Sequence, residues 1–391
     1  MMKKTLLIIS FILSYFSGIY SQQTGDTSVY LITCGPGTET YSIYGHSALR
    51  IVISEKKSDN VYNWGLFDFN TPNFTWKFAK GRLDYLLGVE SMQNFLQVYL
   101  FEKRFVYSQR INLTAGETEQ LLTLINENLK PENIKYRYDF FYDDCSTRIR
   151  DIIEKSIGGK LLYPPAVKGK LPTFRDMVGK YQDPYPWLTL GIDLIMGSPG
   201  DKKASYRDRM FLPIDLQNEL SEAVINRDGK MIPLLQNPDV ILDYATPEIK
   251  KNILLMPAFV FTFLLIIVMI LSAFIESKKY INLFDTIILS VFSVLAILMI
   301  LFNFFTDHQQ MRWNLNIIWL NPFILICFVT LLLNRKGEIW FRFLFYISVA
   351  FLVLHLFLPQ SFNIAFLPLT IILIIRSSVR AGFEWNPHSL K

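Results

Sequence analysis

The sequence predicts a protein of two parts, an α+β domain over residues 22–250 and an all-α transmembrane bundle of about five helices over residues 251–391. The first observation is a break in composition. Residues 22–250 mix polar, charged and aromatic residues, whereas residues 253–376 are almost continuously apolar. A helix needs about 20 apolar residues to cross a bilayer, so the second region holds several spans. The second observation is that strand-like and helix-like segments are interspersed before the break.

Residues 1–21 have the pattern of a secretory signal peptide. Lys3 and Lys4 precede the apolar run Leu6–Leu13, and small residues follow up to Ser21. A charged start, an apolar run and small residues in this order direct export. An uncleaved anchor is the alternative, and both interpretations place residues 22–250 outside the cytoplasm.

Three strands are expected first, at Ser28–Thr33, His46–Ser54 and Asn60–Phe69, because these segments are rich in β-branched and aromatic residues. The turn residues Glu55–Asp59 make the second and third an antiparallel hairpin.

A further strand is expected at Arg104–Leu113, where the apolar residues alternate. Thr114 and Glu117 then have the spacing of a capping box, which predicts a helix running to about Lys130.

A second helix is expected to start at Asp143-Asp144-Cys145 and to end near Gly158-Gly159, after an extended aromatic stretch at Tyr136–Tyr142. Cys145 then lies in the first turn, where free backbone N–H groups and the helix dipole favour a thiolate. The alternative is that Cys145 only packs in the hydrophobic core beside Ile149, since buried cysteines are common. A disulfide to Cys34 is another.

A thiol nucleophile needs a base within hydrogen-bond reach and a third group that orients the base. His46 is the only histidine of residues 22–250, so it is the only candidate imidazole there. Asn63, on the facing strand of the hairpin, is the first choice for the orienting group, and Asp68 is the second.

The apolar region divides into five candidate spans. They are Ile253–Ile275, Ile281–Phe305, Leu315–Leu333, Ile339–Phe357 and Phe362–Ile375. Lysines and arginines gather after the first, third and fifth spans, at Lys278-Lys279, Arg335-Lys336 and Arg376 with Arg380. By the positive-inside rule, this alternation places the preceding domain on the outer side of the inner (cytoplasmic) membrane, in the periplasm.

The expected outer loop Thr306–Pro322 carries His308 and Arg312 among tryptophans and asparagines. One interpretation is an interfacial aromatic belt with ordinary loop polarity. The other is a substrate contact, in which both side chains meet a phosphate or carboxylate.

Three stretches together resemble the Lnb-type lipoprotein N-acyltransferases. They are TCGPGTETYSIYGHSA from Thr33, NWGLFDF from Asn63 and DDCSTRIRD from Asp143. The order of histidine strand, polar strand and late cysteine helix is also similar to circularly permuted papain-like (NlpC/P60-like) enzymes. The resemblance covers essentially the whole chain, and it implies Cys145 as nucleophile and His46 as base. The family often has Asn before its cysteine, so Asp144 leaves the role of that position, helix cap or oxyanion contact, open.

The resemblance implies transfer of a fatty acyl chain from a phospholipid donor, through a thioester on Cys145, to the N-terminal amine of a lipoprotein acceptor. Backbone N–H groups at Cys145 and Ser146 would hold the oxyanion. Arg148 and Arg150 are candidate phosphate contacts or helix supports. A structural salt bridge is favoured for Arg150, which is near Asp151 and Glu154.

Two rival functions remain. One is a cell-wall peptide hydrolase with the same Cys/His pair, although such an enzyme does not need five spans. The other is a non-catalytic membrane assembly protein with a packed Cys145. No cofactor and no metal are expected, because the candidate residues form no ligand cluster. The net charge of +5 without a basic run excludes a nucleic-acid partner. The stretch Pro186–Lys203 is expected to be a lid, an interfacial segment or ordinary core.

Overall fold

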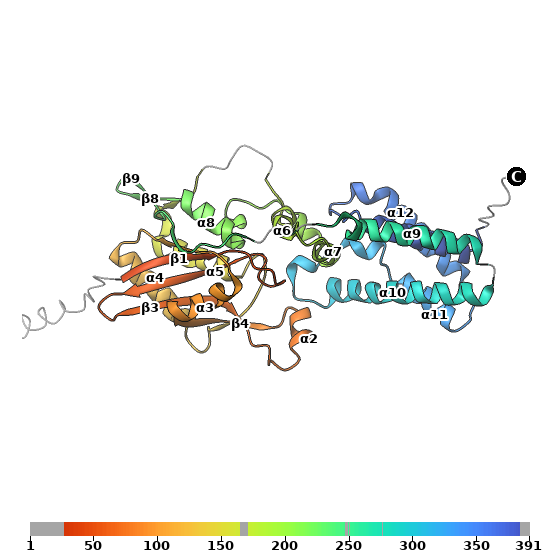
Figure 1. Cartoon of the computed structure of the whole chain (residues 1–391), viewed down its shortest axis with the longest axis horizontal. Helices are drawn as coiled ribbons and strands as arrows, with labels where there is room; N and C mark the ends of the chain where they lie inside the picture. The colour runs from red at the N-terminus through yellow and green to blue at the C-terminus, as the bar shows by residue number, and fades with distance from the viewer. Residues whose placement is uncertain (1–26, 165–170, 247–248, 250, 276, 384–391) are drawn as a thin grey trace, which may run out of the picture.

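The computed structural model describes residues 27–164, 171–246, 249, 251–275 and 277–383. The expected signal peptide lies outside the described residues. The rest forms an α+β domain followed by a helical region, as the sequence predicts (Figure 1).

A seven-stranded antiparallel sheet is the scaffold of the first domain. In spatial order its strands are β10 (Asp239–Leu242), β5 (Val106–Arg110), β1 (Thr27–Cys34), β2 (His46–Ile53), β3 (Ser58–Leu66), β4 (Asp84–Ser91) and β6 (Lys135–Arg137). The pairing of β2 with β3 confirms the predicted hairpin. The last strand, β10, comes from just before the apolar region, so the sheet is completed only by residues close to the membrane helices.

Helices cover both faces of the sheet. They are α3 (Met92–Glu102), α4 (Ala115–Asn128), α5 (Cys145–Ile157) and α8 (Pro213–Glu222). Side chains alternate between the faces of a strand. Leu49 and Ile51 therefore pack towards α4, α5 and α8, whereas Ala48 packs towards α3.

The two predicted helices of this domain are confirmed. α4 begins with a capping box between Thr114 and Glu117, and α5 begins at Cys145 with a capping box between Asp144 and Thr147. The extended stretch predicted at Tyr136–Tyr142 is wrong beyond residue 137. There the Asp139 side chain accepts the backbone N–H groups of Phe141 and Tyr142 and folds the chain into a turn.

The remaining elements of this part were not predicted individually. They are α2 (Phe74–Ala79), β7 (Leu161–Leu162), α6 (Phe174–Gln182), α7 (Pro186–Ile195), β8 (Val224–Arg227) and β9 (Lys230–Pro233), where β7, β8 and β9 form a small separate sheet. Short 3-10 helices lie at Gly158–Lys160, Ser198–Asp201, Asp208–Phe211, Ile253–Leu255, Gln309–Met311, Leu315–Ile318 and His355–Phe357.

The C-terminal region contains helices at all five predicted spans. They are α9 (Pro257–Phe274), α10 (Lys278–Phe304), α11 (Phe323–Leu332), α12 (Glu338–Leu354) and α13 (Phe366–Arg380). Among the described residues, α9, α10 and α12 with its 3-10 extension are long and apolar enough to cross a membrane. Residues 309–332 make a fourth candidate that is bent by 58°. By length and composition alone, the described residues therefore hold three helices, or up to four with the bent pair, that could cross a membrane. α13, with 15 residues, is shorter than these helices.

A buried ion pair joins α10 to α13. Arg376 Nε lies 2.6 Å from the Asp285 carboxylate, and these side chains are 4% and 1% exposed. Arg380 binds the same carboxylate. The sequence placed both arginines beyond the fifth span, but they belong to α13, where pairing offsets the cost of burying charge.

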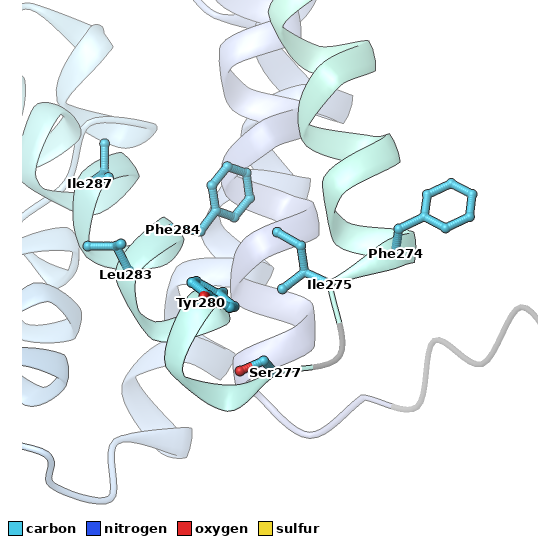
Figure 2. A pocket seen from close by; sticks show the side chains of 7 residues that line it. All are labelled: Phe274, Ile275, Ser277, Tyr280, Leu283, Phe284 and Ile287. Atoms are coloured by element: carbon cyan, nitrogen blue, oxygen red, sulfur yellow. The ribbon is translucent and has the colours of Figure 1, made fainter.

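An apolar cavity of about 430 Å³ lies between the end of α9 and the start of α10 (Figure 2). Phe274, Ile275, Tyr280 and Phe284 are among the side chains that line it. It is at the end of the bundle opposite the sheet domain (Figure 1), so it does not belong to the site described below.

α6 and α7 lie between the sheet and the bundle (Figure 1). Leu190, Leu194 and Ile195 of α7 pack against the core of the bundle. Asn314 Nδ2 donates to the carbonyl of Leu194 at 2.7 Å, and Trp187 Nε1 donates to Leu255 at 2.9 Å. The first half of Pro186–Lys203 therefore joins the two parts of the protein, and none of the α7 residues is fully buried.

Candidate active site

Cys145 is the first residue of α5, and its side chain is 8% exposed. The backbone N–H groups of Ser47, Ser146 and Cys145 itself face the sulfur, and the Ser146 hydroxyl lies 3.9 Å away. Ser47 directly follows His46 at the start of β2. The nucleophile candidate thus lies against the backbone of the strand that carries the base candidate.

His46 and Asn63 are joined by a hydrogen bond of 2.6 Å between Nε2 and the amide oxygen Oδ1. An amide oxygen only accepts, so the neutral ring carries its proton on Nε2 and has its lone pair on Nδ1. Asn63 is 6% exposed and is fixed within the sheet opposite Gly88. The imidazole is therefore held in one tautomer and one orientation.

The sharp entry into β2 depends on Gly45. Its φ is +81°, and a Cβ there would lie 2.7 Å from the carbonyl oxygen of Cys34. This is the left-handed region that favours glycine. The glycine lets the chain turn back so that His46 begins its strand directly opposite Cys34.

Asp68, the second choice for the orienting residue, lies elsewhere. It follows β3 and accepts the backbone N–H of Asn70 at 2.8 Å at an exposed turn. Of the two candidates, the structure brings Asn63 to His46.

Burial dominates the electrostatics of the Cys/His pair. It raises the pKa of the Cys145 thiol, although the surrounding N–H groups and the Ser146 hydroxyl oppose the shift. It lowers the pKa of His46 to about 4, against the opposing effect of the hydrogen bond that His46 donates to Asn63. The expectation that the helix terminus makes Cys145 a thiolate is therefore wrong for the free protein, since loss of hydration outweighs the N–H groups. Thiol and imidazole are both neutral at pH 7.

Cys34 and Cys145 do not form the disulfide considered as an alternative, because both cysteines are free. Cys34 is completely buried at the end of β1, where burial raises its pKa to about 12. Its thiol is hydrogen-bonded with Tyr99, and the guanidinium of Arg104 lies nearby. Cys34 is a structural residue behind the histidine.

Three further predicted residues support the start of α5. The Asp144 carboxylate accepts the backbone N–H of Thr147 at 2.8 Å, so it is occupied as the helix cap. The Ser146 hydroxyl donates to Ser47 Oγ at 3.3 Å and ties α5 to β2. Arg148 forms an ion pair with Asp143 and covers the ring of Tyr136 at 3.6 Å. These side chains shape the site but are engaged within the protein.

Arg150 pairs with Asp151 at 2.7 Å, as predicted. Arg207 bridges the same aspartate and Glu154. Asp201 binds Arg175 at 2.9 Å beside α7.

His308 docks the outer loop on the sheet domain, whereas the Arg312 side chain bonds within the loop. His308 Nε2 lies 2.8 Å from the carbonyl oxygen of Phe78, and Arg312 donates to the carbonyl of Thr306. Asp307 adds an ion pair with Arg82 at 2.7 Å. Both predicted residues therefore lie at the junction between the sheet domain and the bundle.

Sequence reasoning missed two buried donors near Cys145. Tyr136 is 8% exposed, and neither its hydroxyl nor Nε1 of Trp64 has a hydrogen-bond partner among the described residues. Both belong to the apolar core that contains Cys145. Both residues lie in aromatic, strand-like stretches of the sequence. That pattern does not distinguish a functional donor from a core residue, because aromatic residues are common in protein cores.

Among the residues that the structure describes, no group of three or more His, Cys, Asp and Glu side chains is arranged to hold a metal ion. The chemistry that the site can perform with its own groups is nucleophilic attack by a thiol, with a neutral imidazole as proton acceptor and backbone N–H groups near the reacting sulfur.

Two protein-family models match this chain. The Lnb N-terminal periplasmic domain matches residues 9–177, and the Lnb transmembrane domain matches residues 248–384. No curated protein and no solved structure matches it. The first match includes His46, Asn63 and Cys145, so the site lies wholly within it.

Proposed function

This chain belongs to the Lnb family, and that membership supports a role in lipoprotein N-acylation at a membrane. We propose that the chain is a lipoprotein N-acyltransferase with Cys145 as its nucleophile. The acyl donor is a phospholipid, and the acceptor is the N-terminal amine of a lipoprotein. The chain is a membrane protein with an exported N-terminal domain. We place it in the inner membrane with the catalytic domain in the periplasm.

In the first half-reaction the Cys145 sulfur attacks the carbonyl carbon of a phospholipid acyl ester. Nε2 of His46 carries the ring proton and donates it to Asn63, so Nδ1 has the free lone pair. Nδ1 therefore takes the thiol proton. The tetrahedral intermediate collapses with cleavage of the bond to the glycerol oxygen. That oxygen takes the proton from His46, and lysophospholipid leaves a thioester on Cys145.

In the second half-reaction the acceptor amine, in its neutral form, attacks the thioester carbon. His46 takes a proton from the nitrogen and returns it to the sulfur as the carbon–sulfur bond breaks. The products are an amide on the lipoprotein and the free Cys145 thiol. The lowered pKa of His46 keeps the imidazole neutral when each nucleophile arrives, although it also makes the imidazole a weaker base than one with a pKa near 7.

The negative oxygen of each tetrahedral intermediate needs nearby donors. The N–H groups of Ser47, Cys145 and Ser146, which face the sulfur, are available for this, because the acyl carbon binds to that sulfur. Their fixed position, at a helix start and a strand start, requires no rearrangement during the reaction.

Two contacts carry the proposal. Asn63 fixes the His46 ring, and the backbone N–H of Ser47, the residue after His46, faces the Cys145 sulfur. The bundle supports a lipid substrate rather than a soluble one. Donor and acceptor are both anchored in the membrane, and α7 ties the catalytic domain to that surface.

The test is the mass of the intact protein after incubation with phospholipid. An added acyl mass on the Cys145 peptide, with release of lysophospholipid, is the expected result. Cys145→Ala and His46→Ala are both expected to abolish it while the protein accumulates in the membrane. Cys34→Ala is the matched control, because this thiol is buried and structural.

Near-normal activity of either variant would sink the catalytic assignment. Release of peptides from cell wall, without an acylated Cys145, would instead support a peptide hydrolase. An inert Cys145 with neither product would support a non-catalytic membrane protein.

A further inference from the structure

A polar cavity of about 430 Å³ lies between the sheet domain and the outer loop of the bundle. Three segments line it: the turn at residues 81–82 before β4, residues 137–139 and 142–143 before α5, and residues 307–309 of the outer loop. Its size is within the range of small-molecule sites, roughly 300–1,000 Å³.

The cavity is next to the nucleophile. Asp143, which lines it, is two residues before Cys145. Tyr138, another lining residue, is close enough to Asp144 and Cys145 for their charges to contribute to the raised pKa of its phenol. A molecule in this cavity would therefore lie beside the start of α5.

Most charges around the cavity are already paired. Arg82 binds Asp307, Arg137 binds Asp84, and Asp143 binds Arg148. The exception is the carboxylate of Asp139, which takes part in none of the ion pairs among the described residues.

The hydrogen bonds of Asp139 also leave one oxygen available. The backbone N–H groups of Phe141 and Tyr142 both donate to Oδ1, at 3.0 and 3.2 Å. Oδ2 has no hydrogen bond among the described residues, so it can accept a donor from a bound molecule. Tyr138 and Tyr142 contribute aromatic rings to the same lining.

We propose that this cavity is a subsite for a primary ammonium group, bound by Asp139 Oδ2 and by the rings of Tyr138 and Tyr142. A carboxylate supplies charge and a strong acceptor, and aromatic faces attract cations. The inference rests on the proposed function, which supplies two such groups. They are the ethanolamine headgroup of a phospholipid donor and the protonated amino terminus of a lipoprotein acceptor.

The experiment measures binding to full-length Cys145→Ala protein in detergent at pH 7, so no turnover is needed. The first pair of probes is a short-chain phosphatidylethanolamine and its N-acetylated form. The second pair is a synthetic diacylglyceryl-cysteinyl peptide with a free or an acetylated α-amine. We expect the amine form of at least one pair to bind about tenfold more tightly, the size of a hydrogen bond to a charged group.

Asp139→Asn is expected to remove this preference, because the amide keeps Oδ1 as acceptor for the two N–H groups but loses the charge. Asp59→Asn is the matched control, since this carboxylate pairs with Arg50 and does not line the cavity. Tyr142→Leu is the second variant. Tyr142 is exposed at the surface, and we expect its loss to reduce the preference about two- to fivefold.

A preference limited to the lipid pair identifies the headgroup as the occupant, and one limited to the peptide pair identifies the acceptor. Equal binding of amine and acetylated forms in both pairs, or a preference that Asp139→Asn leaves intact, overturns the proposal. Failure of the proposed function would appear separately, as absence of a Cys145 thioester in the wild-type protein.

Discussion

The Nε2 atom of His46 lies 2.6 Å from the amide oxygen of Asn63, across two neighbouring strands of the main sheet. His46 pairs with Cys34 of β1 and Asn63 pairs with Gly88 of β4, so both residues are positioned by strands of the sheet rather than by a flexible loop. Nδ1, the ring nitrogen that is not engaged with Asn63, is the one that we propose accepts the proton of Cys145. Four predictions follow from this arrangement and from the burial around it.

Loss of the Asn63 side chain should slow turnover without unfolding the domain. Asn63→Ala leaves His46 free to rotate and to change tautomer. We expect kcat to fall roughly 10- to 100-fold, less than for loss of a general base, because His46 itself is retained. Asn60→Ala on the same strand is the control, since that side chain only bonds with Ser58. Steady-state kinetics would decide, and equal activity of both variants would remove Asn63 from the site.

The acid limb of the pH profile should lie near pH 4. His46 must be neutral to accept a proton, and burial lowers its pKa from the ordinary 6.5 to about 4. The imidazole therefore remains a base throughout pH 5–7, and kcat/KM should fall only as pH drops through about 4. An acid limb near 6.5 would show that His46 is not shielded from water in the active protein.

Asp144 should act through its hydrogen bonds and not through its charge. Its carboxylate caps α5, and burial holds the pKa of Asp144 well above its usual range. Asp144→Asn preserves the acceptor and should retain most activity, whereas Asp144→Ala should cost about 1 kcal/mol of stability and misplace Cys145. Thermal unfolding and kinetics of the two variants test this. A large loss of activity in Asp144→Asn would point to a substrate contact.

Asp285 should be a principal determinant of bundle stability. Asp285→Asn leaves Arg376 and Arg380 without their counter-charge inside the bundle, and we expect a loss of roughly 3–5 kcal/mol, as for other broken buried pairs. Glu338→Gln at the exposed start of α12 is the control. Unfolding in detergent gives the measurement, and equal stability of the two variants would contradict the assignment.

Local patterns were sufficient for much of the exported domain. The hairpin of β2 and β3, the capping box of α4 and the start of α5 at Cys145 were predicted correctly because they depend on residues close together in the chain. The stretch from Lys135 was harder, since aromatic residues suit both a strand and a buried turn. Only the hydrogen bonds of Asp139 decide for the turn.

The charge state of the site illustrates the opposite limit. A helix start at Cys145 indicates a stabilised thiolate, but the packing around the sulfur reverses that expectation. The outer loop is similar, because His308 and Arg312 have the composition of a headgroup site, but His308 is engaged with the sheet domain and Arg312 with the backbone of its own loop. A local sequence pattern predicts neither how deeply a side chain is buried nor which residue an exposed side chain contacts.

The sequence by itself determined the two-part organisation, the strand and helix that carry His46 and Cys145, and the family, because composition, periodicity and motifs are properties of the chain. Only the tertiary structure decided which polar residue orients the histidine, that the thiol and imidazole are neutral, and that Arg376 lies in the bundle. Those outcomes depend on desolvation and on contacts between residues far apart in the chain, which arise only when the elements pack together.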